Sequence, residues 1–309
     1  MLLSIAAMKL DLKSVREQQL PIDFLAKKLV EGFITGLHKS PYHGFSVEFA
    51  EHRLYNNGES TRNIDWKVFA KTDKLFTKRY EEETNLRCHI LIDSSSSMRY
   101  PEATQAKLHF SIYAAAGLSW LLHKQRDAVG ITSFADKILS QSEVRSTQSH
   151  IHKLFISLED LLKNKIDKQK TSISKVLHEV ANKIHKRSLV VIFSDMFSGN
   201  ESHEELFSAL MHLRHNNHEV VLFHVADHET EVDFDFNDRP HLFIDLETGE
   251  KIKLQPSQIK QNYSIAAKSE LTYLKNKCGQ LGIEFVEADV KQDFNHIFNS
   301  FLIKRSKMN

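Results

Sequence analysis

Cysteine is scarce in this 309-residue chain, which contains Cys88 and Cys278 and no other. Two thiols so far apart cannot build a disulfide framework or a thiolate metal site, so we expect a protein of a reducing compartment. Glycine and proline are also few, with 10 and 5 residues. Because an all-β sandwich needs many tight turns, this scarcity favours a helix-rich α/β fold.

A surplus of charge of one sign is also lacking, since 41 Lys and Arg residues stand against 40 Asp and Glu. This balance argues against binding to nucleic acid or anionic lipid through bulk electrostatics. No apolar run approaches the roughly 18 residues that a membrane span requires, and the amino-terminal MLLSIAAM is a poor signal peptide. We therefore expect a cytoplasmic protein with no membrane span.

What the chain does contain is an alternation of short apolar runs with helical patterns. We predict buried strands over 86–93, 127–135, 188–195, 219–227 and 282–288. Helices are predicted over 15–38, 63–71, 103–124, 151–162, 173–184, 203–215, 257–280 and 293–305. Other predictions are a weak strand over 45–49, a polar loop over 140–149, an exposed acidic loop over 228–238 and a hairpin over 241–254.

This alternation specifies an α/β fold with a doubly wound, mostly parallel sheet and helices on both faces. In such a sheet, ligands bind at the carboxyl ends of the strands, near the point where the strand order switches. Functional residues are therefore sought where the predicted strands end.

Polar side chains follow the first buried strand, in the array Asp93-Ser94-Ser95-Ser96-Ser97-Met98. A compact turn there directs Asp93, Ser95 and Ser97 toward one point, while the two serines between them face elsewhere. The third buried strand ends at Asp195, on the same edge of the sheet, and Thr171 stands just ahead of a helix. Oxygen donors suit hard divalent cations. We predict a site for Mg²⁺, or for Mn²⁺ or Ca²⁺, formed by these five residues.

The array DSSSSM, with the later Thr171 and Asp195, resembles the metal-ion-dependent adhesion site of von Willebrand factor A domains. Upstream, the segment 53–83 resembles the signature of the bacterial domain-of-unknown-function family 58, at Arg53, Tyr55, Gly58, Arg62, Asp65, Trp66 and the glutamates 81 to 83. The resemblance implies a Rossmann-like A domain over 85–309 and a family-specific N-terminal extension over 1–84 that packs on it. It also implies that Ser95, Ser97 and Thr171 bind the cation directly or nearly so, while Asp93 and Asp195 act mainly through water.

Neutral hydroxyl ligands leave a bound ion much of its positive charge, so the ion attracts an Asp or Glu side chain of a partner. We therefore predict a non-enzymatic, divalent-cation-dependent protein-interaction module. The resemblance implies a MoxR-type AAA+ ATPase as the partner, because members of the family usually accompany such ATPases and are thought to act as their adaptors.

Two positions of this sequence depart from the common pattern of the metal-ion-dependent adhesion site. Ser96 stands where glycine is common, and Ser172 stands where aspartate is common.

Two alternatives stay open. A metal-dependent phosphohydrolase would use Asp93 as its nucleophile, although Ser95 stands where phosphatases of the haloacid dehalogenase type place their general-acid aspartate. A scaffold with a decayed metal site would bind no ion.

The many histidines form no HExxH pair, and we interpret them as solvated or capping residues.

Overall fold

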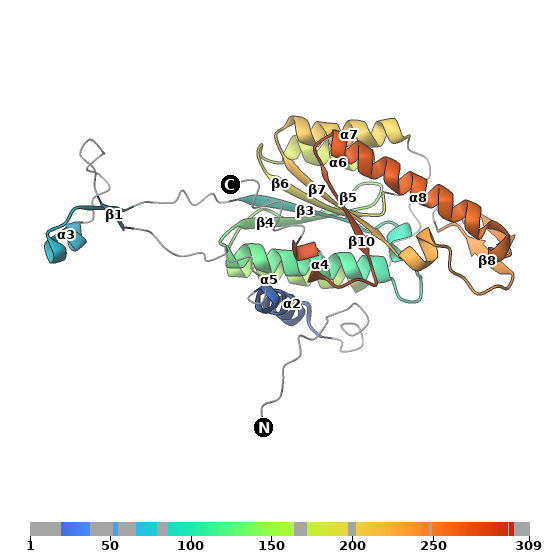
Figure 1. Ribbon diagram of the computed structural model, residues 1–309, viewed down its shortest axis with the longest axis horizontal. Coiled ribbons are helices and arrows are strands. Elements are labelled where there is room, and N and C mark those ends of the chain that lie inside the picture. Colours follow the sequence, from blue (N-terminus) through green and yellow to red (C-terminus); the bar gives the residue numbers. More distant parts are fainter. Residues whose placement is uncertain are drawn as a thin grey trace, which may run out of the picture.

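The computed structural model describes residues 20–37, 52–54, 66–78, 86–163, 172–196, 202–246, 249–295 and 297–299. Its centre is a six-stranded sheet of β3 (Arg87–Asp93), β4 (Ala128–Phe134), β5 (Ile138–Gln141), β6 (Leu189–Ser194), β7 (Glu219–Ala226) and β10 (Glu284–Asp289). The strand order is β10-β7-β6-β3-β4-β5, and every pair of neighbours is parallel except β4 and β5 (Figure 1). The predicted doubly wound, mostly parallel α/β sheet is confirmed.

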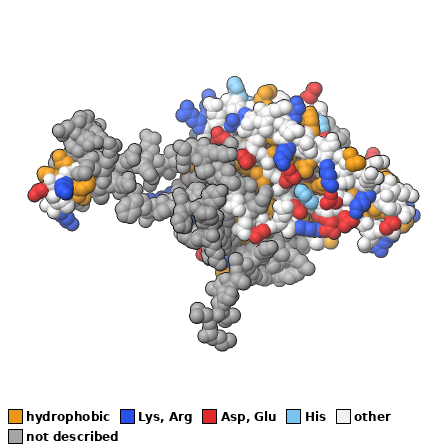
Figure 2. Space-filling view, in the orientation of Figure 1, with side chains coloured by type: hydrophobic (Ala, Val, Ile, Leu, Met, Phe, Trp, Pro, Cys, Tyr) orange, Lys and Arg blue, Asp and Glu red, His pale blue; other side chains and the backbone are white. Residues whose placement is uncertain are grey.

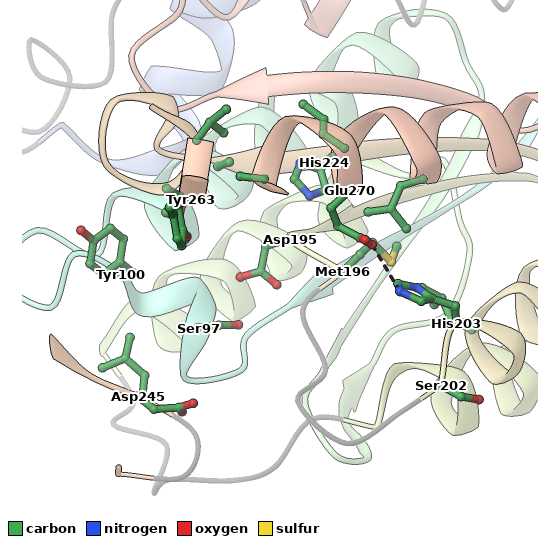
Figure 3. Close-up of a pocket in the computed structure, with 18 of the residues that line it drawn as sticks. Ser97, Tyr100, Asp195, Met196, Ser202, His203, His224, Asp245, Tyr263 and Glu270 are labelled. Atoms are coloured by element: carbon green, nitrogen blue, oxygen red, sulfur yellow. Dashed lines mark ion pairs between the residues drawn. The ribbon is translucent and has the colours of Figure 1, made fainter. Parts of the chain in front are cut away.

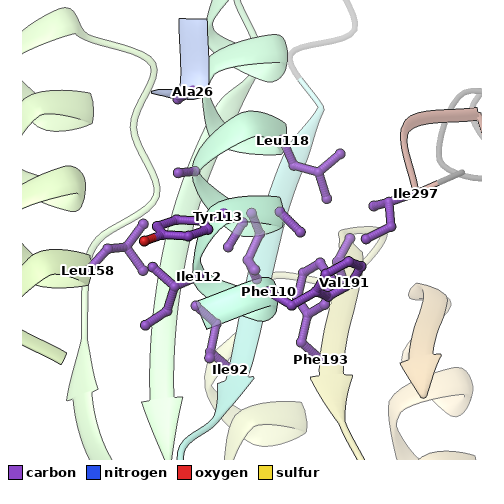
Figure 4. Packing of buried hydrophobic residues seen from close by; sticks show 14 of the residues in the cluster. Ala26, Ile92, Phe110, Ile112, Tyr113, Leu118, Leu158, Val191, Phe193 and Ile297 are labelled. Atoms are coloured by element: carbon purple, nitrogen blue, oxygen red, sulfur yellow. The ribbon is translucent and has the colours of Figure 1, made fainter. Parts of the chain in front are cut away.

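Helices cover both faces of this sheet (Figure 1). One face carries α2 (Ile22–Leu37), α4 (Ala106–Lys124) and α5 (Gln148–Lys163), and the other carries α6 (Ile173–Lys183), α7 (His203–His215) and α8 (Pro256–Gln280). The central strands read as unbroken apolar runs because both of their faces are buried. Figure 4 shows the core on the α4 side, where Phe110 of α4 lies next to Val191 and Phe193 of β6.

The segment before residue 85 contributes one helix to this core. The apolar side of α2, with Leu25, Ala26 and Leu29, packs against α4 and α5. The described remainder is β1 (His52–Leu54), which pairs antiparallel with β2 (Phe76–Lys78), and α3 (Trp66–Thr72) between them in sequence. The predicted strand over 45–49 lies outside the described residues, as does most of the family signature: Tyr55, Gly58, Arg62, Asp65 and the glutamates 81 to 83.

The prediction of a polar loop over 140–149 is wrong at both ends. Ile138–Gln141 form β5, which pairs antiparallel with β4, and α5 begins at Gln148. The hydroxyls of Ser133 and Ser140 lie 2.7 Å apart across the pair. β5 has four residues, Ile-Leu-Ser-Gln, and is mostly exposed, so an edge strand this short carries no apolar alternation that a sequence pattern can detect.

The prediction of an exposed acidic loop over 228–238 is also wrong. His228–Val232 form a turn of π-helix, the segment η3, and both Val232 and Phe234 are buried. The Phe234 ring lies 4.5 Å from the ring of Tyr263 on α8. Acidic residues dominate the composition of 228–238, but Val and Phe at alternate positions give this segment one apolar side.

The hairpin that follows is present as predicted, with β8 (His241–Ile244) paired to β9 (Lys251–Leu254).

The last predicted helix, over 293–305, is described only at its start, where 295 and 297–299 are helical. Phe294 and Phe298 are buried against α4. A Cβ atom on Gly117 would lie 2.6 Å from Cζ of Phe298, so only glycine lets this segment approach α4 so closely.

No helix in the described part of the chain combines the length and apolar character that crossing a membrane requires. Acidic and basic side chains are interspersed over the described surface that faces the viewer in Figure 2. This mixture agrees with the balanced charge of the sequence.

Two histidines are buried near the amino ends of the strands, away from the edge where β3 and β6 end. Among the described residues, Nε2 of His89 and Nε2 of His218 have no hydrogen-bond partner. Burial, with smaller effects of the neighbouring His218, His185 and Arg87, lowers the pKa of His89 to about 4. The folded protein therefore resists protonation of this imidazole, whereas the unfolded chain accepts a proton near pH 6.5.

We expect His89 to make the fold acid-sensitive. Above pH 6.5 His89 is neutral in both states, so it adds no pH dependence; between pH 6.5 and about 4 only the unfolded state gains the proton, and stability is lost as the pH falls. From pH 7.5 to pH 5, wild type should lose about 2 kcal/mol more unfolding free energy than His89→Leu, measured by urea titration. The same pH dependence in both proteins would contradict this assignment.

Candidate functional site

The strand order reverses between β3 and β6. The chain runs outward from β3 to β4 and β5, then returns to β6 on the other side of β3 and continues to β7 and β10. Ile92 is paired with Phe193, so Asp93 and Ser194 end neighbouring strands side by side. The strand order therefore switches at this edge of the sheet, which is where α/β proteins bind ligands.

The turn after β3 gathers the predicted oxygen donors. The Ser95 amide donates a hydrogen bond to Oδ1 of Asp93 at 2.9 Å, and the hydroxyls of Ser95 and Ser97 lie 3.0 Å apart. Ser94 faces the other way and donates its hydroxyl to the carbonyl of Phe134 at 2.9 Å. Ser97 opens the short 3-10 helix η2 (Ser97–Arg99), which fixes the direction of this turn. Asp93, Ser95 and Ser97 therefore form one compact group.

Asp93 is fully buried, and both of its carboxylate oxygens accept hydrogen bonds. Oδ2 accepts from the Ser194 hydroxyl at 2.7 Å, and that hydroxyl in turn accepts from the amide of Met196 at 2.9 Å. Burial and the charge of Asp195 together raise the pKa of Asp93 to about 7, although the hydrogen bonds from Ser194 and Ser95 oppose this shift. A negative charge at this buried carboxylate is therefore costly unless a positive charge lies close to it.

The burial of Asp93 bears on the phosphohydrolase alternative. A nucleophilic carboxylate must approach phosphorus with a free oxygen, but Asp93 has an exposed fraction of 0% and both oxygens are engaged. Its hydrogen bonds to the Ser95 amide and the Ser194 hydroxyl suit a residue that orients the turn after β3 and lies beneath the hydroxyls of Ser95 and Ser97.

The structure adds a residue that our sequence predictions did not include. Lys107, in the first turn of α4, is buried with 1% of its side chain exposed. Its ammonium donates to Oδ2 of Asp195 at 2.8 Å and to Oε1 of Glu231 at 2.6 Å. Burial alone would lower the pKa of Lys107, but the two carboxylates outweigh that effect and the pKa is raised. Lys107 therefore remains a cation inside the protein.

A sequence signal for Lys107 exists in hindsight. Residues 106–122 of α4 are buried nearly all the way round, which their Ala- and Leu-rich pattern indicates. A lysine inside such a helix must find a carboxylate, because an isolated buried charge is too costly. Glu231 was missed for the opposite reason: it lies in the segment that we interpreted as a solvated acidic loop.

A cavity of about 570 Å³ adjoins the group of donors. Ser97 and Asp195 line it, as Figure 3 shows, and so do Glu231 and, from α8, Leu271 and Leu274. Glu270 of α8 also lines it and lies 3.5 Å from the His203 ring. The cavity is thus mostly apolar, with the candidate site at one end.

Of the five predicted site residues, the structure brings Asp93, Ser95, Ser97 and Asp195 to one edge of the sheet. Thr171 lies outside the described residues. Within the described ranges, no group of three or more His, Cys, Asp or Glu side chains is arranged to hold a metal ion. The donors that are present, two neighbouring hydroxyls backed by two carboxylates, are oxygen atoms of the kind that suits a hard divalent ion.

We expect Ser194 to hold the site together. Ser194→Ala removes the donor to Asp93 and the acceptor for Met196, both buried, so it should lower the unfolding free energy by about 1–3 kcal/mol. Ser119→Ala is the matched control, because the buried Ser119 hydroxyl donates only to the carbonyl of Ala115 within α4. Urea unfolding of both variants checks this, and equal losses would contradict it.

The family DUF58, described as a protein of unknown function, matches residues 51–272. An uncharacterized protein of Mycobacterium bovis and one of Mycobacterium tuberculosis are each 24% identical over 131 residues, which are 42% of this chain and 41% of the relative. The chain therefore matches less than half the length of these curated relatives.

Solved structures with a similar arrangement include BatB from Bacteroides thetaiotaomicron, with 16% identity and a TM-score of 0.41 over 72% of this chain and 100% of that one. A von Willebrand factor type A structure from Catenulispora acidiphila has 12% identity and a TM-score of 0.37, covering 59% of this chain and 42% of that one. The sequence match to the family extends from just before β1 into α8, well over half of the chain. The chain therefore belongs to the DUF58 family.

Proposed function

We propose that this protein is a divalent-cation-dependent protein-interaction module. In this proposal Ser95 and Ser97, with Thr171, supply hydroxyl oxygens to Mg²⁺, while Asp93 and Asp195 contribute charge from behind. An open position on the ion accepts an Asp or Glu side chain of a partner protein. The single observation that carries the proposal is the pair of hydroxyls 3.0 Å apart, beside a buried carboxylate, at the switch point of the sheet.

Charge explains why such a site needs its cation. Without an ion, the buried Asp93 and the neighbouring Asp195 repel an approaching carboxylate. A divalent ion reverses this repulsion, and its hydroxyl ligands neutralise none of its charge. Binding of the partner would then depend on the ion and stop when a chelator removes it.

The adjoining cavity supports a protein as the ligand. Its volume of about 570 Å³ is ample for large side chains, and its apolar walls suit residues on either side of the partner's acidic one. The resemblance to the family points to a MoxR-type AAA+ ATPase as this partner. The proposal thus has a testable partner and a testable docking position.

We expect the hydroxyl pair to decide cation binding. By isothermal titration calorimetry, Ser95→Ala combined with Ser97→Ala should weaken Mg²⁺ or Mn²⁺ binding roughly tenfold or more. Ser96→Ala is the control, because Ser96 stands in the same turn and its side chain caps nothing. Mg²⁺ should also raise the melting temperature of wild type, since a ligand that binds only the folded state stabilises it. Wild type that shows neither heat nor a thermal shift would instead favour the scaffold with a decayed site.

We expect a cavity-filling substitution to block the partner and spare the ion. Ala267 lines the cavity, so Ala267→Phe should lower affinity for a purified MoxR-type ATPase, measured with Mg²⁺ and with chelator, about tenfold or more. Ala266→Phe places the same side chain on the exposed side of α8 and should leave affinity unchanged. Partner binding that survives Ala267→Phe, or that ignores the chelator, would contradict docking at this site.

A further inference from the structure

Lys107 is joined to two acidic groups that come from distant parts of the chain. Asp195 follows β6 and Glu231 lies in η3, which follows β7. The side chains of Lys107 and Asp195 are 1% and 7% exposed, so their contact is shielded from solvent. The second oxygen of Glu231 accepts the amide of Asp227 at 2.8 Å, which holds that carboxylate in place. The arrangement is a fixed ion cluster and not a flexible surface pair.

The cluster shares a residue with the candidate cation site, because Asp195 interacts with both Lys107 and Asp93. With Asp93, Asp195 and Glu231 all ionised, the three carboxylates and one ammonium give the combined group a formal charge of −2. A divalent ion brings this charge to zero. Without the lysine, the empty group would carry −3, and the group with its ion would still carry −1.

From this arrangement we propose that Lys107 is the residue that sets the charge of the site, so that one divalent ion both completes it and leaves it able to accept a carboxylate. The proposal rests on the proposed function, because it assumes an ion at the hydroxyl pair. Lys107 acts as a positioning and charge-setting residue and not as a ligand, since an ammonium cannot coordinate a metal.

The physical reason is the low dielectric of a buried site. Removing a fixed positive charge near a cation strengthens the binding of that cation, and it weakens the later binding of an anion to the same place. A residue with a merely structural role would change stability and leave both affinities unaltered. The two roles therefore predict different measurements.

A series of charge variants tests the proposal through Mg²⁺ binding to the full chain, measured by isothermal titration calorimetry. The formal charge of the group is −1 in Glu231→Gln, −2 in wild type and in Lys107→Arg, and −3 in Lys107→Met. Mg²⁺ affinity should rise along this order. Relative to wild type, it should be about tenfold higher in Lys107→Met and about tenfold lower in Glu231→Gln. The double variant Lys107→Met with Glu231→Gln restores −2 and should restore the wild-type affinity.

The double variant also guards against misfolding, because removing Lys107 alone leaves two carboxylates without their counter-charge. Melting temperatures confirm that each variant is folded before its affinity is compared. A second arm uses N-acetylglutamate methylamide as the acidic probe, with the glutamine analogue as its control, on protein saturated with Mg²⁺. Lys107→Met should bind the acidic probe about tenfold more weakly than wild type.

Affinities that follow the formal charge in both arms would support the proposal. Folded variants that all bind Mg²⁺ as wild type does would overturn it and leave Lys107 a structural role. Absence of Mg²⁺ binding in wild type itself is a separate result, because it would overturn the proposed function before the role of Lys107 is reached.

Discussion

The site depends on the burial of acidic groups at the point where the strand order reverses. Parallel pairing of β3 with β6 brings the ends of these strands together, and both ends carry an aspartate. Water cannot screen charges in this crevice, so the protein must compensate them with its own groups. It does so with the amide of Ser95, the hydroxyl of Ser194 and the ammonium of Lys107. The geometry of the turn follows from these contacts.

This compensation is only partial, which gives the crevice its chemical character. In this group the carboxylates outnumber the one ammonium, that of Lys107. The neighbouring hydroxyls of Ser95 and Ser97 are uncharged. The cation site proposed above rests on this remaining imbalance of charge. The cavity beside it, bounded in part by α8, is lined mostly by apolar surface.

Much of the fold could be predicted from the sequence, because the central strands and their crossover helices have strong periodicity. The site edge was predictable for the same reason, since Asp93 ends the buried strand β3 and Asp195 directly follows the buried strand β6. The pairing of Lys107 with Glu231 was not, because it joins residues 124 positions apart whose local patterns give no sign of each other. β5 escaped prediction because four residues with no alternation are too few to indicate a strand, and its pairing with β4 specifies it instead. The ligand role of Thr171 remains a prediction.

The ion cluster around Lys107 joins three elements that are distant along the chain: α4, the end of β6 and η3. None of these contacts forms until the second half of the sheet has docked beside the first. A chain that is still incomplete or partly unfolded therefore lacks the ion cluster. The intact cluster is a property of the completely folded molecule and of no single segment of it.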